Sequence, residues 1–172
     1  MHESELIVGL DKLQSKSVKK DGVIYTPLHI VDAMIDMVAP TPAMSIIEPS
    51  CGHGIFLVRL LSYMNKHHNL AGSELYEWFK NQVTAIDISD TTIQELNVIL
   101  SLYFFKHHAI EITTFDNVIT SDSLFCDTKR YDLAIGNPPY IRTKNLDAEN
   151  ELTRQLQVKY CRQQSILDNL RI

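Results

Sequence analysis

The residues with the most distinctive chemistry are four consecutive ones, Asn137-Pro138-Pro139-Tyr140. Two prolines in a row cannot extend a central strand because they lack amide donors, so the chain must turn rigidly here. The turn fixes the Asn137 amide oxygen and a nearby backbone carbonyl as two hydrogen-bond acceptors, and Tyr140 adds an aromatic face beside them. Such a corner can hold an amine and can stack against a flat ring.

A second candidate site is the loop Glu48-Pro49-Ser50-Cys51-Gly52-His53-Gly54-Ile55-Phe56. Its two glycines stand between an expected strand and an expected helix, where they let the backbone turn tightly and approach a ligand closely. The third glycine of a dinucleotide-binding fingerprint is absent. On the glycines alone, a tight structural turn is an equal alternative.

Two acidic residues follow later expected strands. Asp87 could accept hydrogen bonds from both ribose hydroxyls of a nucleoside. It could instead cap a helix, although Ser89 and Asp90 are better placed as caps. Asp122 could accept from the exocyclic amine of an adenine, or it could be an ordinary turn aspartate.

The elements that position these residues alternate between strands and helices. Strands are predicted over residues 44–48, 83–88, 110–115 and 131–136, and helices over 27–38, 55–67, 91–105 and 147–164. This alternation predicts a Rossmann-like α/β domain, a parallel sheet with helices on both faces. Such sheets bind ligands at the carboxyl ends of their strands, where the candidate residues fall.

The beginning of the chain has a helical pattern of its own. Apolar residues in 3–15 recur at helical spacing, so residues 1–20 are expected to form a helical extension and 21–172 the α/β domain. Thr26 is expected to cap the next helix, with Pro27 at its first position.

Composition excludes several classes of protein. With 45% hydrophobic and 22% charged residues in 172, the sequence is typical of a soluble globular domain. It carries no apolar run long enough to cross a membrane and no signal peptide, so the cytoplasm is the expected location. The formal charge of -5 argues against a stand-alone nucleic-acid binder, despite basic spots in 16–20 and 142–144.

Cysteine and histidine usage predicts neither disulfides nor a metal site. The three cysteines are an odd number and widely spaced. The paired histidines at 67–68 and 107–108 are adjacent, so neither pair can share a helix face as ligands.

Taken in order, these motifs resemble the γ arrangement of AdoMet-dependent N6-adenine DNA methyltransferases, the modification enzymes of restriction–modification and phage-defence systems. The resemblance spans roughly residues 20–146, and Ile141-Arg142 with Asn145-Leu146 after Tyr140 is similar to the type IIG branch. In that family the first loop usually reads Asp-Pro-Ala-Cys-Gly-Ser-Gly-x-Phe. This chain has Glu48, Ser50 and His53 instead, but it keeps the carboxylate and both glycines.

The resemblance implies a role for each matching residue. The cofactor S-adenosylmethionine (AdoMet) would be held by Tyr25, Thr26, Pro27, Glu48, Pro49, Ser50, Cys51, Gly52, Gly54, Phe56, Asp87, Ile88, Asp122, Ser123 and Leu124. The catalytic residues would be Asn137, Pro138, Pro139 and Tyr140, with Asn137 and the Pro138 carbonyl holding the target amine and Tyr140 stacking on the flipped base.

One spacing departs from the expected pattern. Asp87 follows Glu48 by roughly 40 positions, about twice the roughly 20 expected between the first loop and the ribose carboxylate. An inserted turn and short helix over 69–82 would account for the difference.

Two other readings stay open. Methyltransferases that act on a release-factor glutamine or on RNA bases also use Asn-Pro-Pro-Tyr, although their first loop usually reads Asp-x-Gly-x-Gly-x-Gly. A non-catalytic AdoMet-binding module is the other reading.

The resemblance also implies that a complete enzyme has further strands and a target-recognition domain after residue 172. We therefore expect a fragment that methylates little DNA alone and self-associates through an exposed sheet edge. DNA and a restriction subunit or fused nuclease are its expected partners.

Overall fold

The computed structural model describes residues 26–125 and 130–138. The chain divides into two compact units, residues 1–139 and 140–172, and every described residue belongs to the first. The expected helices over 3–15 and 147–164 lie outside the described residues, as do Tyr25, Pro139 and Tyr140. The domain boundary at residue 20 therefore stays a prediction.

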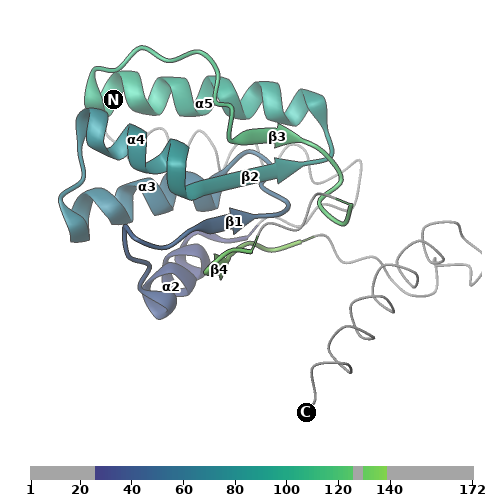
Figure 1. Ribbon diagram of the computed structural model, residues 1–172, viewed down its shortest axis with the longest axis horizontal. Coiled ribbons are helices and arrows are strands. Elements are labelled where there is room, and N and C mark those ends of the chain that lie inside the picture. Colours follow the sequence, from purple (N-terminus) through teal and green to yellow (C-terminus); the bar gives the residue numbers. More distant parts are fainter. Residues whose placement is uncertain (1–25, 126–129, 139–172) are drawn as a thin grey trace, which may run out of the picture. The chain divides into compact units, whose positions relative to one another are not determined.

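The described strands form one parallel sheet. They are β1 (Ile46–Glu48), β2 (Val83–Asp87), β3 (Val118–Thr120) and β4 (Leu133–Ala134), in the order β3-β2-β1-β4 (Figure 1). The chain moves outward from β1 to β2 and β3, and then returns to place β4 on the other side of β1. This reversal of strand order is where open α/β sheets bind ligands.

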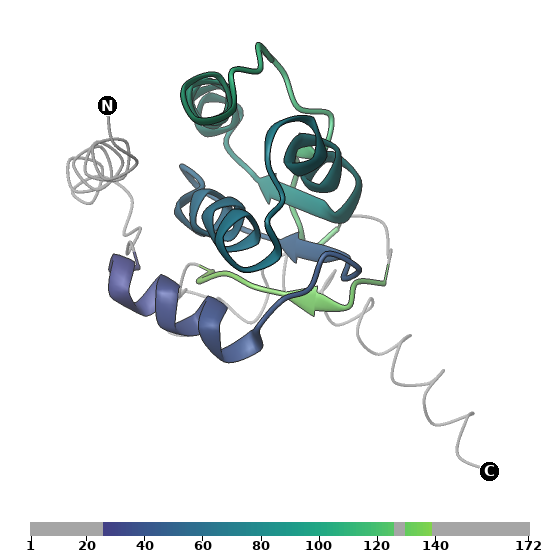
Figure 2. The same ribbon diagram turned by 90° about the vertical axis from the view of Figure 1, so that its left-hand side faces the viewer.

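Four helices are described around this sheet: α2 (Leu28–Val38), α3 (Ile55–His68), α4 (Gly72–Gln82) and α5 (Asp90–His108). Helix α5 packs on β2 and β3, α4 packs on β2 and against both α3 and α5, and α2 packs against α3 (Figures 1 and 2). Helix α4 is the predicted insertion over 69–82. No helix in the described part of the chain is long and apolar enough to span a membrane.

The core explains why these helices form where they do. The first turn of α3, Ile55–Val58, is buried on all sides, and Leu60, Leu61 and Met64 continue a buried face. In α5 the buried residues recur every three or four positions, which puts them on one face. Aromatic rings of α4, α5 and the following segment meet edge to face. The fully buried side chains of the two longest helices are Leu57, Val58, Leu60, Leu61, Met64, Leu96, Leu100 and Phe104.

The prediction of a strand over 110–115 is wrong. Residues 110–115 form no strand, and the third strand is Val118–Thr120 instead. Ile110 and Ile112 pack against the core, and the N–H of Phe115 donates to the Asn97 side chain at 3.1 Å rather than to a neighbouring strand. The alternating apolar residues therefore indicate that this loop packs against the core, and they do not indicate a strand of the sheet.

The predicted start of the helix after Thr26 is also wrong. Helix α2 begins at Leu28, Pro27 occupies the cap position in an extended conformation (ψ 142°), and no side chain caps the helix. The Thr26 hydroxyl is used elsewhere, as described below.

Candidate functional site

The ends of three parallel strands meet at one edge of the sheet. Strand β1 ends at Glu48, β2 ends at Asp87, and β4 leads directly into Gly136 and Asn137. Strands β2 and β4 both pair with β1, and all three are parallel, so their ends lie at the same edge. An alanine Cβ built on Gly136 would lie 3.4 Å from Glu48 Cγ, which shows how closely the ends of β4 and β1 approach.

Asp87 organises the glycine-containing loop. Its Oδ2 accepts a hydrogen bond from the Gly52 N–H at 2.9 Å, and its Oδ1 accepts one from the Ser89 N–H at 2.9 Å. The Cys51 N–H donates to the Ile86 carbonyl at 2.8 Å. The carboxylate is therefore fixed in orientation, and each of its oxygens keeps a further lone pair for a ligand hydroxyl.

The two glycines of the loop meet different surroundings. Gly52 has φ +50° and nothing lies within 4 Å of where a Cβ would stand, whereas at Gly54, with φ +78°, a Cβ would overlap the Leu96 side chain. Gly54 therefore serves the packing of α3 against α5. Gly52 leaves open space over the loop. The side chain of Ile88, which follows Asp87, is 73% exposed.

Two polar side chains of the loop are buried without a partner. Glu48 is 2% exposed and its Oε2 has no hydrogen-bond partner among the described residues. The Ser50 hydroxyl is in the same state. Buried polar atoms are normally satisfied, so these two hydrogen-bonding groups are left without a partner by the described part of the chain.

The surroundings of Glu48 and Cys51 disfavour the ionised forms of both side chains. Burial, and then the negative charge of Asp87, raise the pKa of the Glu48 carboxyl well above its ordinary value. Burial, together with Glu48 and Asp87, likewise raises the pKa of the Cys51 thiol. The thiol thus stays protonated at neutral pH and is no nucleophile. Phe56, predicted at the cofactor, is 3% exposed and belongs to the core beneath the loop.

Asn137 is held by a residue far away in the sequence. Its Nδ2 donates a hydrogen bond to Thr26 Oγ1 at 3.0 Å across 111 positions. Thr26 lies just before α2 and Asn137 just after β4, so this contact joins the first and last described elements. Pro138 is exposed beside it.

Asp122 lies in the segment that follows β3. The Ser121 N–H donates to the Asp87 carbonyl at 2.9 Å, which brings this segment next to the end of β2. The Asp122 carboxylate accepts from the Leu124 N–H at 3.0 Å and thus closes its own turn, with Ser123 half-buried between them. This contact is that of a turn aspartate.

The sequence interpretation missed two contacts of the site. The first is the Ser89 N–H, which donates to Asp87 Oδ1 at 2.9 Å; the cap that the Ser89 hydroxyl forms on α5, by accepting from the Thr92 N–H at 3.2 Å, was predicted. The spacing Asp-x-Ser, typical of an Asx turn, could have indicated the first contact. His53 contacts Glu95 of α5 at 2.8 Å, and no sequence pattern indicates that pairing.

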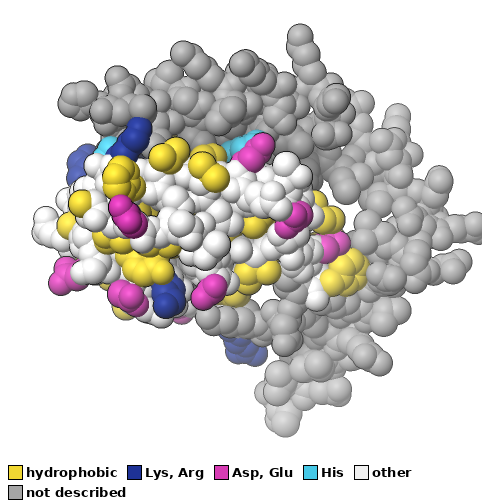
Figure 3. Space-filling model, turned by 90° about the horizontal axis from the view of Figure 1, so that it is seen from above, with side chains coloured by type: hydrophobic (Ala, Val, Ile, Leu, Met, Phe, Trp, Pro, Cys, Tyr) yellow, Lys and Arg dark blue, Asp and Glu magenta, His cyan; other side chains and the backbone are white. Residues whose placement is uncertain are grey.

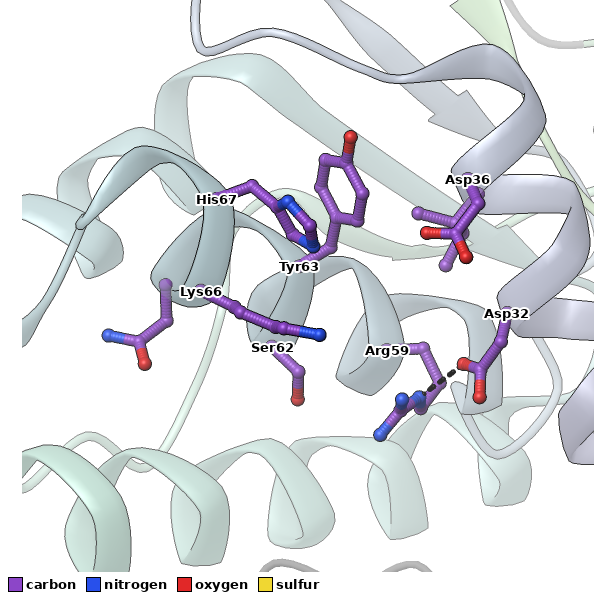
Figure 4. Close-up of a pocket in the computed structure, with 9 residues that line it drawn as sticks. Asp32, Asp36, Arg59, Ser62, Tyr63, Lys66 and His67 are labelled. Carbon is purple, nitrogen blue, oxygen red and sulfur yellow. Dashed lines mark hydrogen bonds and ion pairs between the residues drawn. The ribbon is translucent and has the colours of Figure 1, made fainter.

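A cavity of about 480 Å³ lies elsewhere, between α2 and α3. In Figure 4, Asp32 and Asp36 of α2 face Arg59, Tyr63, Lys66 and His67 of α3, and Arg59 pairs with Asp32 at 2.6 Å. No residue of the predicted site lines this cavity: its lining is Asp32, Ile35, Asp36, Arg59, Ser62, Tyr63, Asn65, Lys66 and His67.

Comparison with solved structures agrees with the architecture. A modification subunit assigned to a type I restriction enzyme from Vibrio vulnificus matches 77% of this chain and 26% of its own, with a TM-score of 0.53 at 17% identity. A nuclease-deleted form of the Type ISP restriction-modification enzyme LlaGI, in complex with a DNA substrate mimic, matches 71% of this chain and 12% of its own, with a TM-score of 0.51 at 16% identity. These likenesses confirm the predicted α/β fold.

Parallel strands with a glycine-containing loop at their carboxyl edge define a Rossmann-like ligand-binding domain. The family model described as N-6 DNA Methylase matches residues 8–165. The chain therefore belongs to the N-6 DNA methylase family, as the motifs predicted, and this family uses AdoMet.

Curated relatives agree with this assignment. The Type II methyltransferase M.HincII of Haemophilus influenzae is 33% identical over 127 residues, which is 73% of this chain and 18% of that protein. The Type II restriction enzyme and methyltransferase RM.BcgI of Heyndrickxia coagulans is 27% identical over 128 residues, or 72% of this chain and 19% of that protein. The chain thus spans about a fifth of the length of these relatives.

Proposed function

We propose that this chain forms the cofactor-binding and target-amine end of a methyltransferase that transfers a methyl group from AdoMet to the exocyclic N6 amine of adenine in DNA. The observation that carries the proposal is the meeting of Glu48, Asp87 and Asn137 at one edge of the sheet, around an open glycine loop. Membership of the N-6 DNA methylase family supports it.

The described residues fit AdoMet. The open space over Gly52 can receive it. We propose that Glu48 Oε2 and Ser50 Oγ, which have no partner among the described residues, become its hydrogen-bond partners when it is bound. Asp87 is oriented for ribose hydroxyls, and the exposed side chain of Ile88 offers an apolar surface for an adenine ring. Tyr25, Thr26, Pro27, Pro49 and the turn at Asp122 to Leu124 complete the proposed lining.

When bound, AdoMet supplies a methyl group activated by a positively charged sulfur. The adenine amine is a poor nucleophile because its lone pair is conjugated into the ring. The Asn137 amide oxygen and the Pro138 carbonyl would accept hydrogen bonds from its two N–H groups. These bonds would bias the nitrogen toward tetrahedral geometry and stabilise the positive charge that develops on it. Tyr140 would stack on the flipped base and hold it in line.

Partners of the proposed enzyme follow from its substrate. DNA would be bound mainly by other parts of the protein, because this sequence has a formal charge of -5 and phosphate contacts need clustered Lys and Arg. On the face shown in Figure 3, acidic side chains lie among hydrophobic ones, and the described Lys and Arg side chains are scattered. A restriction subunit or a fused nuclease is the proposed companion of the methylase.

The test is Asn137→Ala, with Asn81→Ala as the matched control because Asn81 is exposed on α4. Methyl transfer to duplex DNA is measured with the full protein or assembly in which this chain occurs, and AdoMet binding is measured by calorimetry. Asn137→Ala should lower the methylation rate by about 100-fold or more, while the Kd for AdoMet stays within about threefold. Near-normal methylation in this variant, or loss of AdoMet binding with it, would contradict the proposed role.

A further inference from the structure

We infer that Thr26 is a positioning residue for the target amine, acting through the side chain of Asn137. This inference rests on the proposed function and extends it. It starts from the hydrogen bond in which Asn137 Nδ2 donates to Thr26 Oγ1 at 3.0 Å.

The Thr26 hydroxyl has no structural task in its own helix. A threonine in front of a helix usually caps it by accepting from a backbone N–H. Helix α2 has no side-chain cap, and the cap position belongs to Pro27. The hydroxyl is used by Asn137 instead, which lies on a different element 111 positions later.

The backbone and the side chain of Asn137 are held by different neighbours. A residue before proline is confined to extended backbone conformations, so Pro138 restricts the backbone of Asn137. The amide of an asparagine still rotates over a broad range about χ2. The bond to Thr26 stops this rotation, because it ties one end of the amide to the start of α2.

The structure places Nδ2 of the amide, and not Oδ1, toward Thr26. With Nδ2 donating to Thr26, the free end is Oδ1, and no described residue donates to it. A turned amide would present N–H groups to an incoming amine, whose own N–H groups would repel them. The arrangement therefore suits a ligand that donates, such as an exocyclic amine, and disfavours one that accepts.

A side-chain amide resonance tests the bond itself in this chain. The ¹⁵N–¹H signals of the Asn137 amide can be assigned because they disappear in Asn137→Asp. Thr26→Val keeps the shape of the side chain but removes the hydroxyl, so it should shift these signals and speed their hydrogen exchange. Thr26→Ser should keep them near their normal positions, and Thr113→Val, at an exposed threonine, should leave them unchanged. If Thr26→Val fails to fold, Thr26→Ala replaces it.

Methyl transfer by the full protein tests the consequence of the bond. Loss of one net hydrogen bond corresponds to a kcat lower by about threefold to tenfold in Thr26→Val. Thr26→Ser should recover most of this loss. A purely structural tie would instead lower the Tm and leave the kcat of the folded protein unchanged.

The two arms separate this inference from the proposed function. Unchanged Asn137 signals in Thr26→Val overturn the inference whatever the enzyme does. Normal kcat in Thr26→Val, in a protein whose Asn137→Ala variant is inactive, overturns it while the proposed function stands. Shifted Asn137 signals in a protein that methylates no DNA support the positioning contact and overturn the proposed reaction.

Discussion

Glu48 is a carboxyl side chain in a place that disfavours charge. It is 2% exposed, one of its oxygens has no partner among the described residues, and Asp87 stands nearby. The folded chain therefore retains a proton on Glu48 at pH values where the unfolded chain has lost it. By linkage, this contribution to stability is complete below the ordinary pKa of 4.5 and is lost as the pH rises toward the raised folded value.

We predict that Glu48→Gln removes this loss. Between pH 4.5 and the raised pKa, the free energy of unfolding of the unsubstituted chain should fall by up to about 1.4 kcal/mol per pH unit relative to Glu48→Gln. Chemical denaturation of both proteins across this pH range measures the difference. Glu111→Gln, at an exposed position, is the matched control, and parallel pH curves for Glu48→Gln and the unsubstituted chain would show that Glu48 is ionised in the fold.

At the scale of residues, the sequence predicted that the candidate residues follow the ends of strands, but it did not predict the contacts they make. Asn137, Asp87 and the glycine loop were found because prolines, glycines and carboxylates after strands are rare enough to be noticed. The bond from Asn137 to Thr26 was not predicted, since nothing local links positions that far apart. A helix cap was the better local reading of Thr26, and a tertiary contact overrode it.

At the scale of elements, the loop between β1 and α3 contains two glycines with different tasks. At Gly54 an added Cβ would meet Leu96 of α5, whereas at Gly52 it would meet nothing within 4 Å. Both have positive φ, so any substitution adds backbone strain.

This contrast predicts that alanine at Gly54 mainly affects stability and that alanine at Gly52 mainly affects ligand binding. Gly54→Ala should destabilise the fold by roughly 2 to 4 kcal/mol, from strain and overpacking together. Gly52→Ala should cost only about 1 kcal/mol in stability but weaken AdoMet binding by about tenfold or more, because its methyl group fills the space left for the ligand. Chemical denaturation measures the stability of both variants, and calorimetric titration measures their Kd for AdoMet. If the two variants lose equal amounts of stability and equal amounts of affinity, the two glycines do not have different roles.

The elements were predictable where an apolar pattern coincides with pairing. Helices α3 and α5 appear within a few residues of their predicted bounds, because each contains a long set of apolar residues that must be buried. The third strand was misplaced because Val118–Thr120 buries only Val118, while the preceding loop buries Phe115 and half-buries its isoleucines. Burial of apolar side chains and hydrogen-bonded pairing of strands are separate properties, and the sequence pattern indicates burial more clearly than pairing.

At the scale of the molecule, β4 is an edge of the described sheet. It pairs with β1 on one side, and among the described strands nothing pairs with its other side. Ala134 on this edge is exposed. Unpaired edges present backbone groups that another chain can use.

We predict that this chain self-associates through β4. Light scattering over a range of concentrations should give a mass that rises above that of the monomer, and Ala134→Lys should lower it because charge on an edge discourages pairing. Exposed Ala109→Lys, at the far end of α5, serves as a charge-matched control. A monomer mass at every concentration would rule this association out.

The pairing of β4 with β1 also affects the order in which contacts can form while the chain is being translated. Ser45 and Asp132, which join the starts of these two strands, are 87 positions apart, whereas Gly52 and Asp87 are 35 apart. The longer closure costs less than about 1 kcal/mol more in chain entropy, so stability hardly distinguishes the two contacts. The order of synthesis does distinguish them, because the ribosome completes the glycine-containing loop and strand β2, which ends at Asp87, well before it reaches Asn137. Under the proposed function, the residues assigned to the nucleoside are therefore synthesised before those assigned to the target base.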